Sequence, residues 1–232
     1  MIITPSIMVV NRTFRLCAVV WQALLLLTSI YQSDIIYAKV EESMAEPTKT
    51  VFLTFHDNIN LESVNRCMDF CNKAIQQYKP QQLYFLFSSG GGAVDSGVTL
   101  YNYLRGLPQE VIMHNVGSID SIANVIFLAG KVRYATPASA FLLHGIYWTF
   151  PQGANLTYTQ MQEQMSRFNA AEELTAKIIG ERTKITAEEV RKLFRQGQSK
   201  DPAFALEKGL IDKIVDVNIP AGAPIHSIVA TK

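Results

Sequence analysis

Residues 82–97 read QLYFLFSSGGGAVDSG, and this stretch decides the fold. Gln82–Phe87 is an apolar, aromatic run with the length of a buried β-strand. Ser88–Gly92 predicts a glycine-rich turn, because glycines allow the backbone to turn sharply, and Val94–Leu104 predicts a helix. Strands that alternate with helices along a chain are typical of a parallel sheet with helices packed on it.

The same alternation continues on both sides of this stretch. Strands are expected at Thr50–Phe55, Val111–Val116, Val132–Ala135, Ala140–Leu143 and Leu210–Val217. Helices are expected at Leu61–Tyr78, Ser121–Ala129, Leu156–Arg182, Ala187–Arg195 and Pro202–Lys208. We therefore expect an α/β fold of repeated strand–helix units around a mainly parallel sheet. Asn218–Lys232, which contains two prolines, is expected to be a loosely ordered extension.

The long helix expected at Leu156–Arg182 has only a weak apolar stripe among Gln, Glu and Asn residues. Such a helix could project from the domain and pack against another subunit, or lie on the surface of its own domain. The pattern alone leaves both interpretations open.

Composition limits the classes of function. Hydrophobic residues make up 48% of the 232 residues and charged residues 18%, which is typical of a globular protein. The net charge of +1 and the lack of long basic runs argue against nucleic acid as a partner. Of three cysteines, Cys67 and Cys71 share one helix face, and Cys17 lies in an apolar N-terminal stretch. No second Cys or His pair completes a zinc site, so we expect core residues and no disulfide framework.

The N-terminal segment allows two interpretations. Arg12 and Arg15 precede the uncharged run Leu16–Ser33, which looks like a signal peptide or a membrane anchor. A cleavage site after Ala38 would be consistent with this, although Ile36 is larger than the residue usually found there. Alternatively, translation starts at Met44. The domains expected are a targeting segment 1–43, a main globular domain 44–217 and a tail 218–232. The protein would be membrane-anchored or exported in the first case and cytoplasmic in the second.

Three segments carry residues suited to acyl transfer, which needs a nucleophile, a neighbouring base and backbone donors for an oxyanion. Residues 89–94 supply glycine amides. Residues 117–124 place Ser121 after a strand, at the expected start of an apolar helix, where it is either a nucleophile or a helix N-cap. Residues 141–145 place His144 at the end of a buried strand, as a base or as a core histidine with its hydrogen bonds satisfied.

In this order the motifs resemble those of the proteolytic subunit of Clp protease. The family's Pro-Gly-Gly-Ser-Val-x-x-Gly is similar to residues 90–97, and its Gly-x-Ala-Ala-Ser-Met-Gly is similar to residues 117–123, with Ala-Gly following at 129–130. Its Arg-Tyr-x-x-Pro-x-Ser and Met-x-His-Gln-Pro resemble residues 133–139 and 142–145. Its Ala-x-Glu-Tyr-Gly-Leu-Val-Asp is similar to residues 205–212. The resemblance runs from about Thr50 to Val217.

The resemblance implies a ClpP/crotonase-like fold and a serine endopeptidase that needs no cofactor and no metal. It assigns Ser121 as nucleophile, His144 as base, and the amides of Gly91 and Ile122 as the oxyanion hole. It implies peptide or unfolded protein as substrate and a homo-oligomer of two stacked rings of seven. The long helix would lie at the contact between the rings. A separate AAA+ unfoldase would be the partner of a cytoplasmic protein.

Several positions depart from the family pattern. Gly197 stands where the family has its catalytic aspartate, and Asp201 follows four residues later. His144 would then be oriented by Asp201, by a carbonyl, by the amide of Gln196 or Gln198, or by water. Asp120 precedes Ser121 where the family has a small apolar residue, and Gly145 replaces a glutamine.

Three other hypotheses stay open, and these departures favour the first of them. One is a catalytically impaired subunit that acts as a scaffold or regulator. Another is a crotonase-like acyl-CoA enzyme, although no glutamate lies near the glycine turn or Ser121. The third is a Ser–Lys peptidase that uses Lys131 or Lys177.

Overall fold

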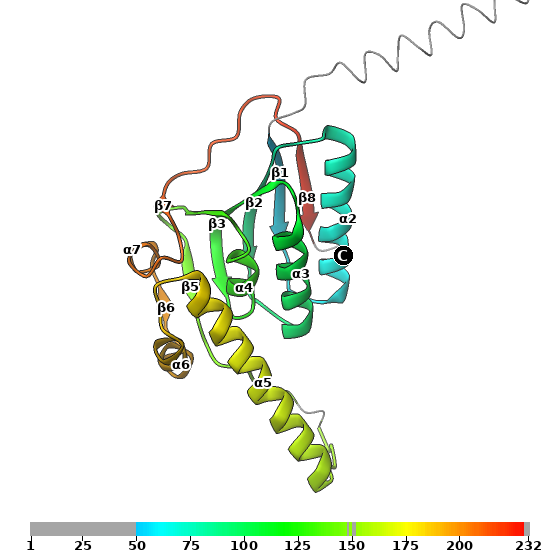
Figure 1. Ribbon diagram of the computed structural model, residues 1–232, viewed down its shortest axis with the longest axis vertical. Helices are drawn as coiled ribbons and strands as arrows, with labels where there is room; N and C mark the ends of the chain where they lie inside the picture. Colours follow the sequence, from blue (N-terminus) through cyan, green and yellow to red (C-terminus); the bar gives the residue numbers. More distant parts are fainter. Residues whose placement is uncertain (1–49, 148, 150–151, 230–232) are drawn as a thin grey trace, which may run out of the picture. The chain divides into compact units, whose positions relative to one another are not determined.

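The computed structural model describes residues 50–147, 149 and 152–229. The strands are β1 (Thr50–His56), β2 (Gln82–Ser89), β3 (Glu110–Asp120), β4 (Val132–Ala135), β5 (Ala140–Leu142), β6 (Ser199–Lys200), β7 (Lys213–Ile214) and β8 (Ile225–Val229). The helices are α2 (Leu61–Tyr78), α3 (Val94–Gly106), α4 (Ala123–Phe127), α5 (Tyr158–Arg182), α6 (Ala187–Gln196) and α7 (Pro202–Glu207). Figure 1 shows them around one sheet.

The sheet has the order β6-β5-β3-β2-β1-β8, and β4 pairs with β3 and β7 beside this path. All pairs are parallel except β5 with β6. The central strand β3 has two successive neighbours on one side: residues 112–115 pair with β4, and residues 118–120 pair with β5. The expected α/β class with a mainly parallel sheet is confirmed.

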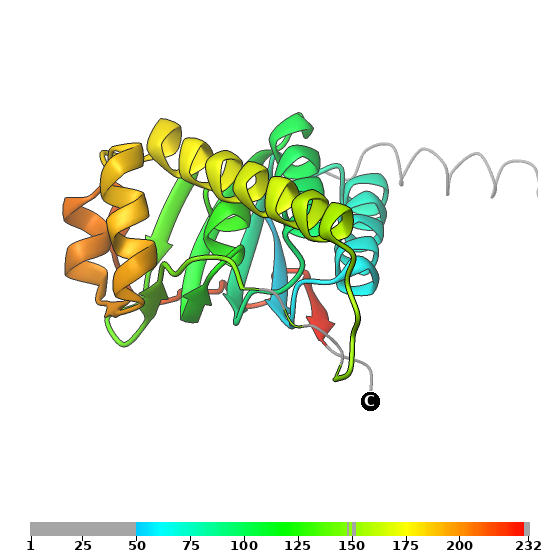
Figure 2. The ribbon, with the colours of Figure 1, turned by 90° about the horizontal axis from the view of Figure 1, so that it is seen from below.

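Helices α2, α3, α4 and α5 cover one face of the sheet, as Figure 2 shows, and the chain that leads to β8 crosses the opposite face. The main core lies under these helices and contains fully buried aromatic rings. Phe55 and Phe87 stack with their centroids 5.1 Å apart, and Phe127 meets Phe141 edge-on at 5.6 Å. This packing fixes the C-terminal ends of the strands, where α/β proteins usually place their ligands.

Helix starts follow local capping chemistry. Asn60 caps α2, Thr157 caps α5 and Thr186 caps α6, each with a reciprocal bond from the residue three positions later. At α6 this second bond holds the pKa of Glu189 below its usual range, because the backbone and hydroxyl of Thr186 donate to the carboxylate.

Each half of helix α5 fits one of the two interpretations that its sequence left open. Its C-terminal half packs on the domain through Thr175, Ala176, Ile178 and Ile179, which are buried. Its N-terminal half extends away from the sheet in Figure 1 and exposes Tyr158, Met161 and Met165. The projecting helix expected from the sequence is therefore present.

Three local expectations were wrong, and one short strand was missed. Residues 225–229 are not loosely ordered, because they pair in parallel with the outer edge of β1 as β8. The strand expected at Leu210–Val217 is only β7, because the N–H groups of Leu210 and Ile211 both donate to the Ala205 carbonyl of α7. Strand β3 extends to Asp120, so the helix expected from Ser121 begins only at Ala123. β6 was not expected at all.

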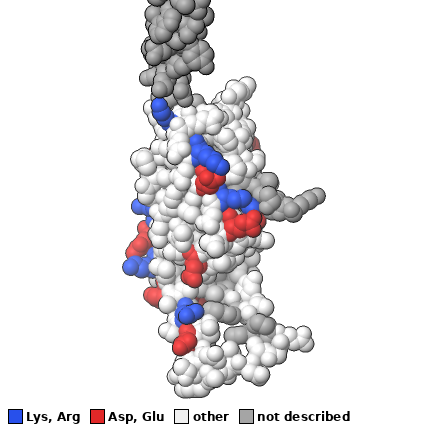
Figure 3. Space-filling model, turned by 90° about the vertical axis from the view of Figure 1, so that its right-hand side faces the viewer, with Lys and Arg blue, Asp and Glu red and all other residues white. Residues whose placement is uncertain are grey.

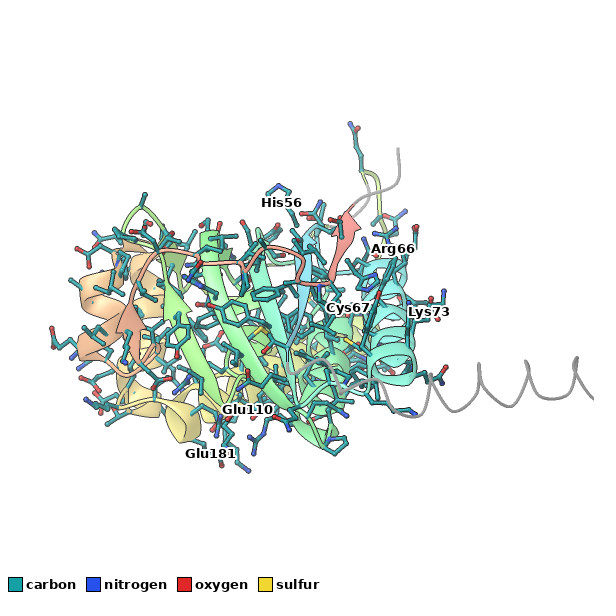
Figure 4. The ribbon with its side chains drawn as sticks, turned by 90° about the horizontal axis from the view of Figure 1, so that it is seen from above. His56, Arg66, Cys67, Lys73, Glu110 and Glu181 are labelled. Carbon is teal, nitrogen blue, oxygen red and sulfur yellow. The ribbon has the colours of Figure 1, made fainter. Side chains whose placement is uncertain are left out.

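The described cysteines behave as the composition suggested. Cys67 and Cys71 are free and buried on α2. Figure 4 shows Cys67 on the side of α2 that faces the sheet and Lys73 on the outer side. The neighbouring Cys71 thiol and burial raise the pKa of Cys67, so it stays a neutral thiol in the core.

The N-terminal interpretations and Cys17 lie outside the described residues, and the expected domain limits stay predictions. Within the part that the structure describes, no helix has both the length and the apolar character needed to cross a bilayer. On the face that carries α2, Figure 3 shows acidic and basic side chains interspersed.

Candidate active site

Ser121 occupies a strained turn between β3 and α4. Its φ is 57°, a left-handed conformation that is uncommon for any residue other than glycine. Its N–H donates to the Leu142 carbonyl at 2.8 Å, and the N-cap of α4 is Ile122. The N-cap interpretation of Ser121 is therefore wrong. Backbone strain of this kind persists where packing enforces it, and it is concentrated at functional sites.

The glycine turn after β2 packs directly against Ser121. Gly91 has a φ of 87°, and a Cβ there would lie 2.8 Å from both the Cβ of Ser121 and the carbonyl oxygen of Asp120. Any larger residue would push the turn apart. The glycine at this position is thus required both by its backbone conformation and by the space available.

The two amides expected to form an oxyanion hole are placed differently. The N–H of Ile122 donates to no other described residue and lies 3.5 Å from the position of a Cβ on Gly91. The Gly91 N–H is directed to the Ser89 hydroxyl at 3.2 Å. Gly92, with a φ of 149°, lines the same cavity as Ser121, and its amide makes no hydrogen bond within the described chain. The sequence did not reveal this role of Gly92, because nothing distinguishes it from the other two glycines of the run.

Asn124 is a second residue whose role the sequence did not reveal. Its side chain is buried, and its Nδ2 donates to the carbonyls of Ile119, Ser121 and Leu142 at 3.0–3.2 Å. It therefore ties the Ser121 turn to the strand that leads to His144. A polar residue inside an otherwise apolar helix was the available signal.

His144 follows β5 and is partly buried. Its Nδ1 lies 2.7 Å from the carbonyl oxygen of Gly145. A carbonyl only accepts hydrogen bonds, so Nδ1 carries the proton and Nε2 of the neutral ring is free to accept one. The exposed ring of Tyr147 stacks on the imidazole with centroids 6.0 Å apart. Of the orienting groups left open by the sequence, the structure supplies a carbonyl.

No carboxylate of the described residues reaches His144. Strands β5 and β6 pair Leu142 with Ser199, and beyond this pair the Gly145 N–H donates to the Phe194 carbonyl of α6 at 3.2 Å. Gly197 ends α6 in a left-handed conformation with open space around its Cα. Asp201 instead caps α7, where it accepts from the Phe204 N–H at 2.8 Å. Gln196 and Gln198 make no hydrogen bond to His144 either.

The carboxylate of Asp120 accepts a bond from the Ser118 hydroxyl at 2.5 Å, within its own strand. It is absent from the described walls of the cavity that Ser121 lines. This placement keeps an additional negative charge away from the space where an oxyanion would form.

Ser121 and His144 line one cavity of about 1000 Å³ between the N-terminus of α3 and the side of α5. Asp95 is the only carboxylate among its described wall residues. Lys131 and Lys177 are not part of the wall and pair with Glu110 and Glu181 at 3.4 and 3.9 Å. The cavity therefore offers a serine, an imidazole and free backbone amides. The described residues contain no cluster of three or more His, Cys, Asp or Glu side chains suited to a metal ion.

Comparison with known proteins agrees with the motifs. The model of the family described as Clp protease matches residues 38–218. The chain belongs to the Clp protease family. This confirms the resemblance, and members of this family include the proteolytic subunits described next.

Three curated relatives are named as proteolytic subunits of an ATP-dependent Clp protease. Subunit 1 from Leifsonia xyli is 25% identical over 58% of this chain and 67% of its own length. The Bigelowiella natans subunit is 32% identical over 33% of this chain and 44% of its own length. Subunit 2 from Borreliella burgdorferi is 34% identical over 31% of this chain and 36% of its own length. The latter two matches thus span less than half of those relatives.

Among solved structures, a point mutant of ClpP1 from Listeria monocytogenes has a TM-score of 0.61 with this chain. The match covers 73% of this chain and 92% of that one, at 18% identity. It supports the ClpP/crotonase-like fold expected from the sequence.

Proposed function

We propose that this chain is a serine endopeptidase in which Ser121 and His144 form a catalytic dyad. The observation that carries the proposal is that one cavity is lined both by a strained Ser121 and by a His144 ring whose Nδ1 proton is held by a carbonyl. This tautomer leaves Nε2 as the proton acceptor that a serine nucleophile requires.

In the proposed reaction the Ser121 oxygen attacks the carbonyl carbon of the scissile peptide bond, and His144 Nε2 takes its proton. The C–N bond then breaks as His144 gives the proton to the leaving amine. Water hydrolyses the acyl-enzyme by the same steps, with His144 as base and then as donor to Ser121. The product is a free carboxyl group, and the serine hydroxyl is restored.

The oxyanion would be held by backbone amides. Ile122 is one donor, because its N–H is free and adjoins Ser121. For the second donor, Gly92 is better supported than Gly91, because the Gly91 amide is already directed to Ser89. Loss of one such donor typically slows the reaction about 100- to 1000-fold.

The test is labelling of the full chain with a fluorophosphonate probe, together with hydrolysis of a fluorogenic peptide. Labelling should occur in the wild type and disappear in Ser121→Ala and His144→Ala. Two matched controls should keep it: Ser96→Ala, beside the cavity on α3, and His56→Ala, which Figure 4 shows pointing outward at the end of β1. A folded wild type that neither labels nor cleaves would favour the impaired scaffold or regulator.

We also propose that the protein acts as a homo-oligomer of stacked rings on peptides or unfolded proteins. The exposed Tyr158, Met161 and Met165 on the projecting half of α5 would then be covered by another copy. An AAA+ unfoldase partner is proposed only for a cytoplasmic protein. Native mass measurement of the wild type and of Met161→Glu tests the assembly: the variant should dissociate.

A further inference from the structure

One wall of the cavity is a continuous face of α5. Arg167, Ala171 and Leu174 succeed one another at spacings of four and three residues, so they lie on the same side of the helix. Phe168 and Ala170 complete this wall. The small alanines between Arg167 and Leu174 leave room for a bound chain along the helix.

Arg167 is an exposed cation without a partner on this wall. Within the described residues it makes no ion pair and no hydrogen bond, and Glu163, one turn before it on α5, has no ion pair either. Further along α5, Glu173 pairs with Arg191 and Lys177 with Glu181. The other charged residue of the described wall is Asp95, in the first turn of α3. It forms no ion pair with Arg167, so each charge is available to a ligand.

The position of Arg167 along α5 relates it to the site. Leu174 precedes the buried residues by which α5 packs against α4, the helix that follows Ser121. Arg167 lies seven residues nearer the projecting end, roughly 10 Å along the helix axis. An extended peptide advances roughly 3.3 Å per residue, so this distance corresponds to about three peptide residues.

We propose that Arg167 gives the site a positional preference for acidic peptides. On the basis of the proposed function, the preferred substrate carries Asp or Glu about three residues from the residue seated against Leu174. The guanidinium can bind a carboxylate with two parallel hydrogen bonds, and it repels Lys or Arg at the same position. At the α3 wall, Asp95 instead favours Lys or Arg and repels acidic residues. The preference for an acidic residue therefore applies at one peptide position and does not follow the net charge of the peptide.

The experiment uses the full chain and a set of apolar decapeptides that carry one Glu or one Lys at each position in turn. Cleavage is measured with the wild type. Binding to Ser121→Ala is measured by fluorescence anisotropy, which needs no catalysis. At one position Glu should exceed Lys about fivefold in kcat/KM and in affinity, the range of an exposed ion pair, and the ratio should shrink as salt is raised.

Charge reversal is the sharpest variant. Arg167→Glu should invert the preference at that position, and Arg167→Gln should remove it. Arg105→Glu, which makes the same charge change at an exposed position of α3 outside the cavity wall, should leave it unchanged. An Arg105→Glu variant that shifts the preference equally, or an Arg167→Glu variant that keeps the wild-type order, would overturn the inference.

Failure of the inference is distinguishable from failure of the proposed function. If the wild type cleaves peptides but Glu and Lys behave alike in both assays, the peptidase stands and the role of Arg167 is rejected. If nothing is cleaved, the binding series on Ser121→Ala still decides whether Arg167 selects acidic chains.

Discussion

The ends of β3 and β5 carry the two proposed catalytic residues, and they are built very differently. Ser121 is fixed by the core: Gly91 touches it, the Leu142 carbonyl accepts its N–H, and Asn124 holds its carbonyl. His144 is held by the carbonyl of the next residue and by the Tyr147 ring, which is 77% exposed. The proposed nucleophile is thus held by many packing contacts and hydrogen bonds, whereas the proposed base is held by few.

Because of this difference, the Ser121 end and the His144 end should respond in opposite ways to substitution. A larger side chain near the tightly packed Ser121 should displace Ser121 and the backbone amides beside it, and so lower activity. Adding contacts at the sparse His144 end should improve catalysis, because an imidazole with few constraints is misaligned for part of the time.

Gly97→Ala should have the largest effect, because it disturbs the Ser121 end. Its Cβ would lie 2.3 Å from Cγ1 of Ile122, whose amide is the proposed oxyanion donor. Displacement of that residue by a fraction of an ångström should slow fluorophosphonate labelling roughly 100-fold. The measurement is the labelling rate beside the thermal midpoint.

Gly106→Ala is the matched control, since it lies on the same helix and its new methyl group meets nothing within 4 Å. It should keep the wild-type rate, with stability within about 1 kcal/mol. Equal loss of rate in both variants would attribute the effect to α3 itself and not to Ile122.

Gly197→Asp should give the next largest effect, an increase in rate of about tenfold or more. Gly197 lies two residues before Ser199, and His144 lies two residues after Leu142, the partner of Ser199 in β5. Gly197 also has open space and the left-handed backbone (φ 56°) that Asp and Asn tolerate better than other side chains. A carboxylate there would stabilise the imidazolium that forms during catalysis.

The control is Gly197→Asn, which has the same shape and backbone cost but no charge. The ratio of the kcat values for the Asp and Asn variants isolates the carboxylate. A ratio of one would mean that the Gly145 carbonyl already orients His144 fully, and the base end would then be as well fixed as the Ser121 end.

The sequence revealed elements whose signals are local. Leu61–Tyr78 was predicted with the bounds that α2 has, because its apolar stripe and its Asn60 cap lie within one segment. Strand β8 was missed because its pairing with β1 joins segments about 170 residues apart, which no local pattern encodes. Ser121 and His144 were found as residue types in motifs, and the structure places them on one cavity.

What the sequence could not give is the geometry that separates the two ends. The positive φ of Ser121 accompanies close packing against Gly91, and the role of Asn124 depends on its contact with Leu142. The bond from His144 to the Gly145 carbonyl is local, but it depends on a ring orientation that the residue types do not specify. Gly197 could be noted from the sequence as a missing carboxylate, yet its replacement by a neighbouring backbone carbonyl needed coordinates. Asp201 was a candidate only because its capping bond to Phe204 was not visible in the sequence.

Tyr147→Ala should lower kcat about fivefold with little change in KM, because the ring restricts the imidazole plane but is mostly exposed. Tyr147→Phe keeps the ring and should restore the wild-type rate. A KM increase in Tyr147→Ala with unchanged kcat would assign the ring to substrate binding instead.

The smallest effect concerns stability and separates His144 from His114, a histidine of β3. His114, within β3, is buried, accepts from the Tyr84 hydroxyl at 2.8 Å and donates to the Val215 carbonyl at 3.0 Å. Burial lowers the pKa of His114 and raises the pKa of Tyr84 to about 12, so this pair is neutral in the folded protein. The Val215 bond and the nearby Asp216 oppose the lowering only in part.

The sign of the pH dependence follows from this lowered pKa. In the unfolded chain His114 binds a proton near pH 6.5, whereas in the folded chain it does so only at lower pH. The stabilisation is therefore complete above about pH 6.5 and is lost as the pH falls from there toward the folded pKa. Urea unfolding between pH 5 and 8 should show this slope in the wild type and in His144→Ala. His114→Phe should be less stable overall and should lack it. A slope that disappears in His144→Ala instead would show that the base end, and not the packed interior of β3, carries the pH-sensitive part of the fold.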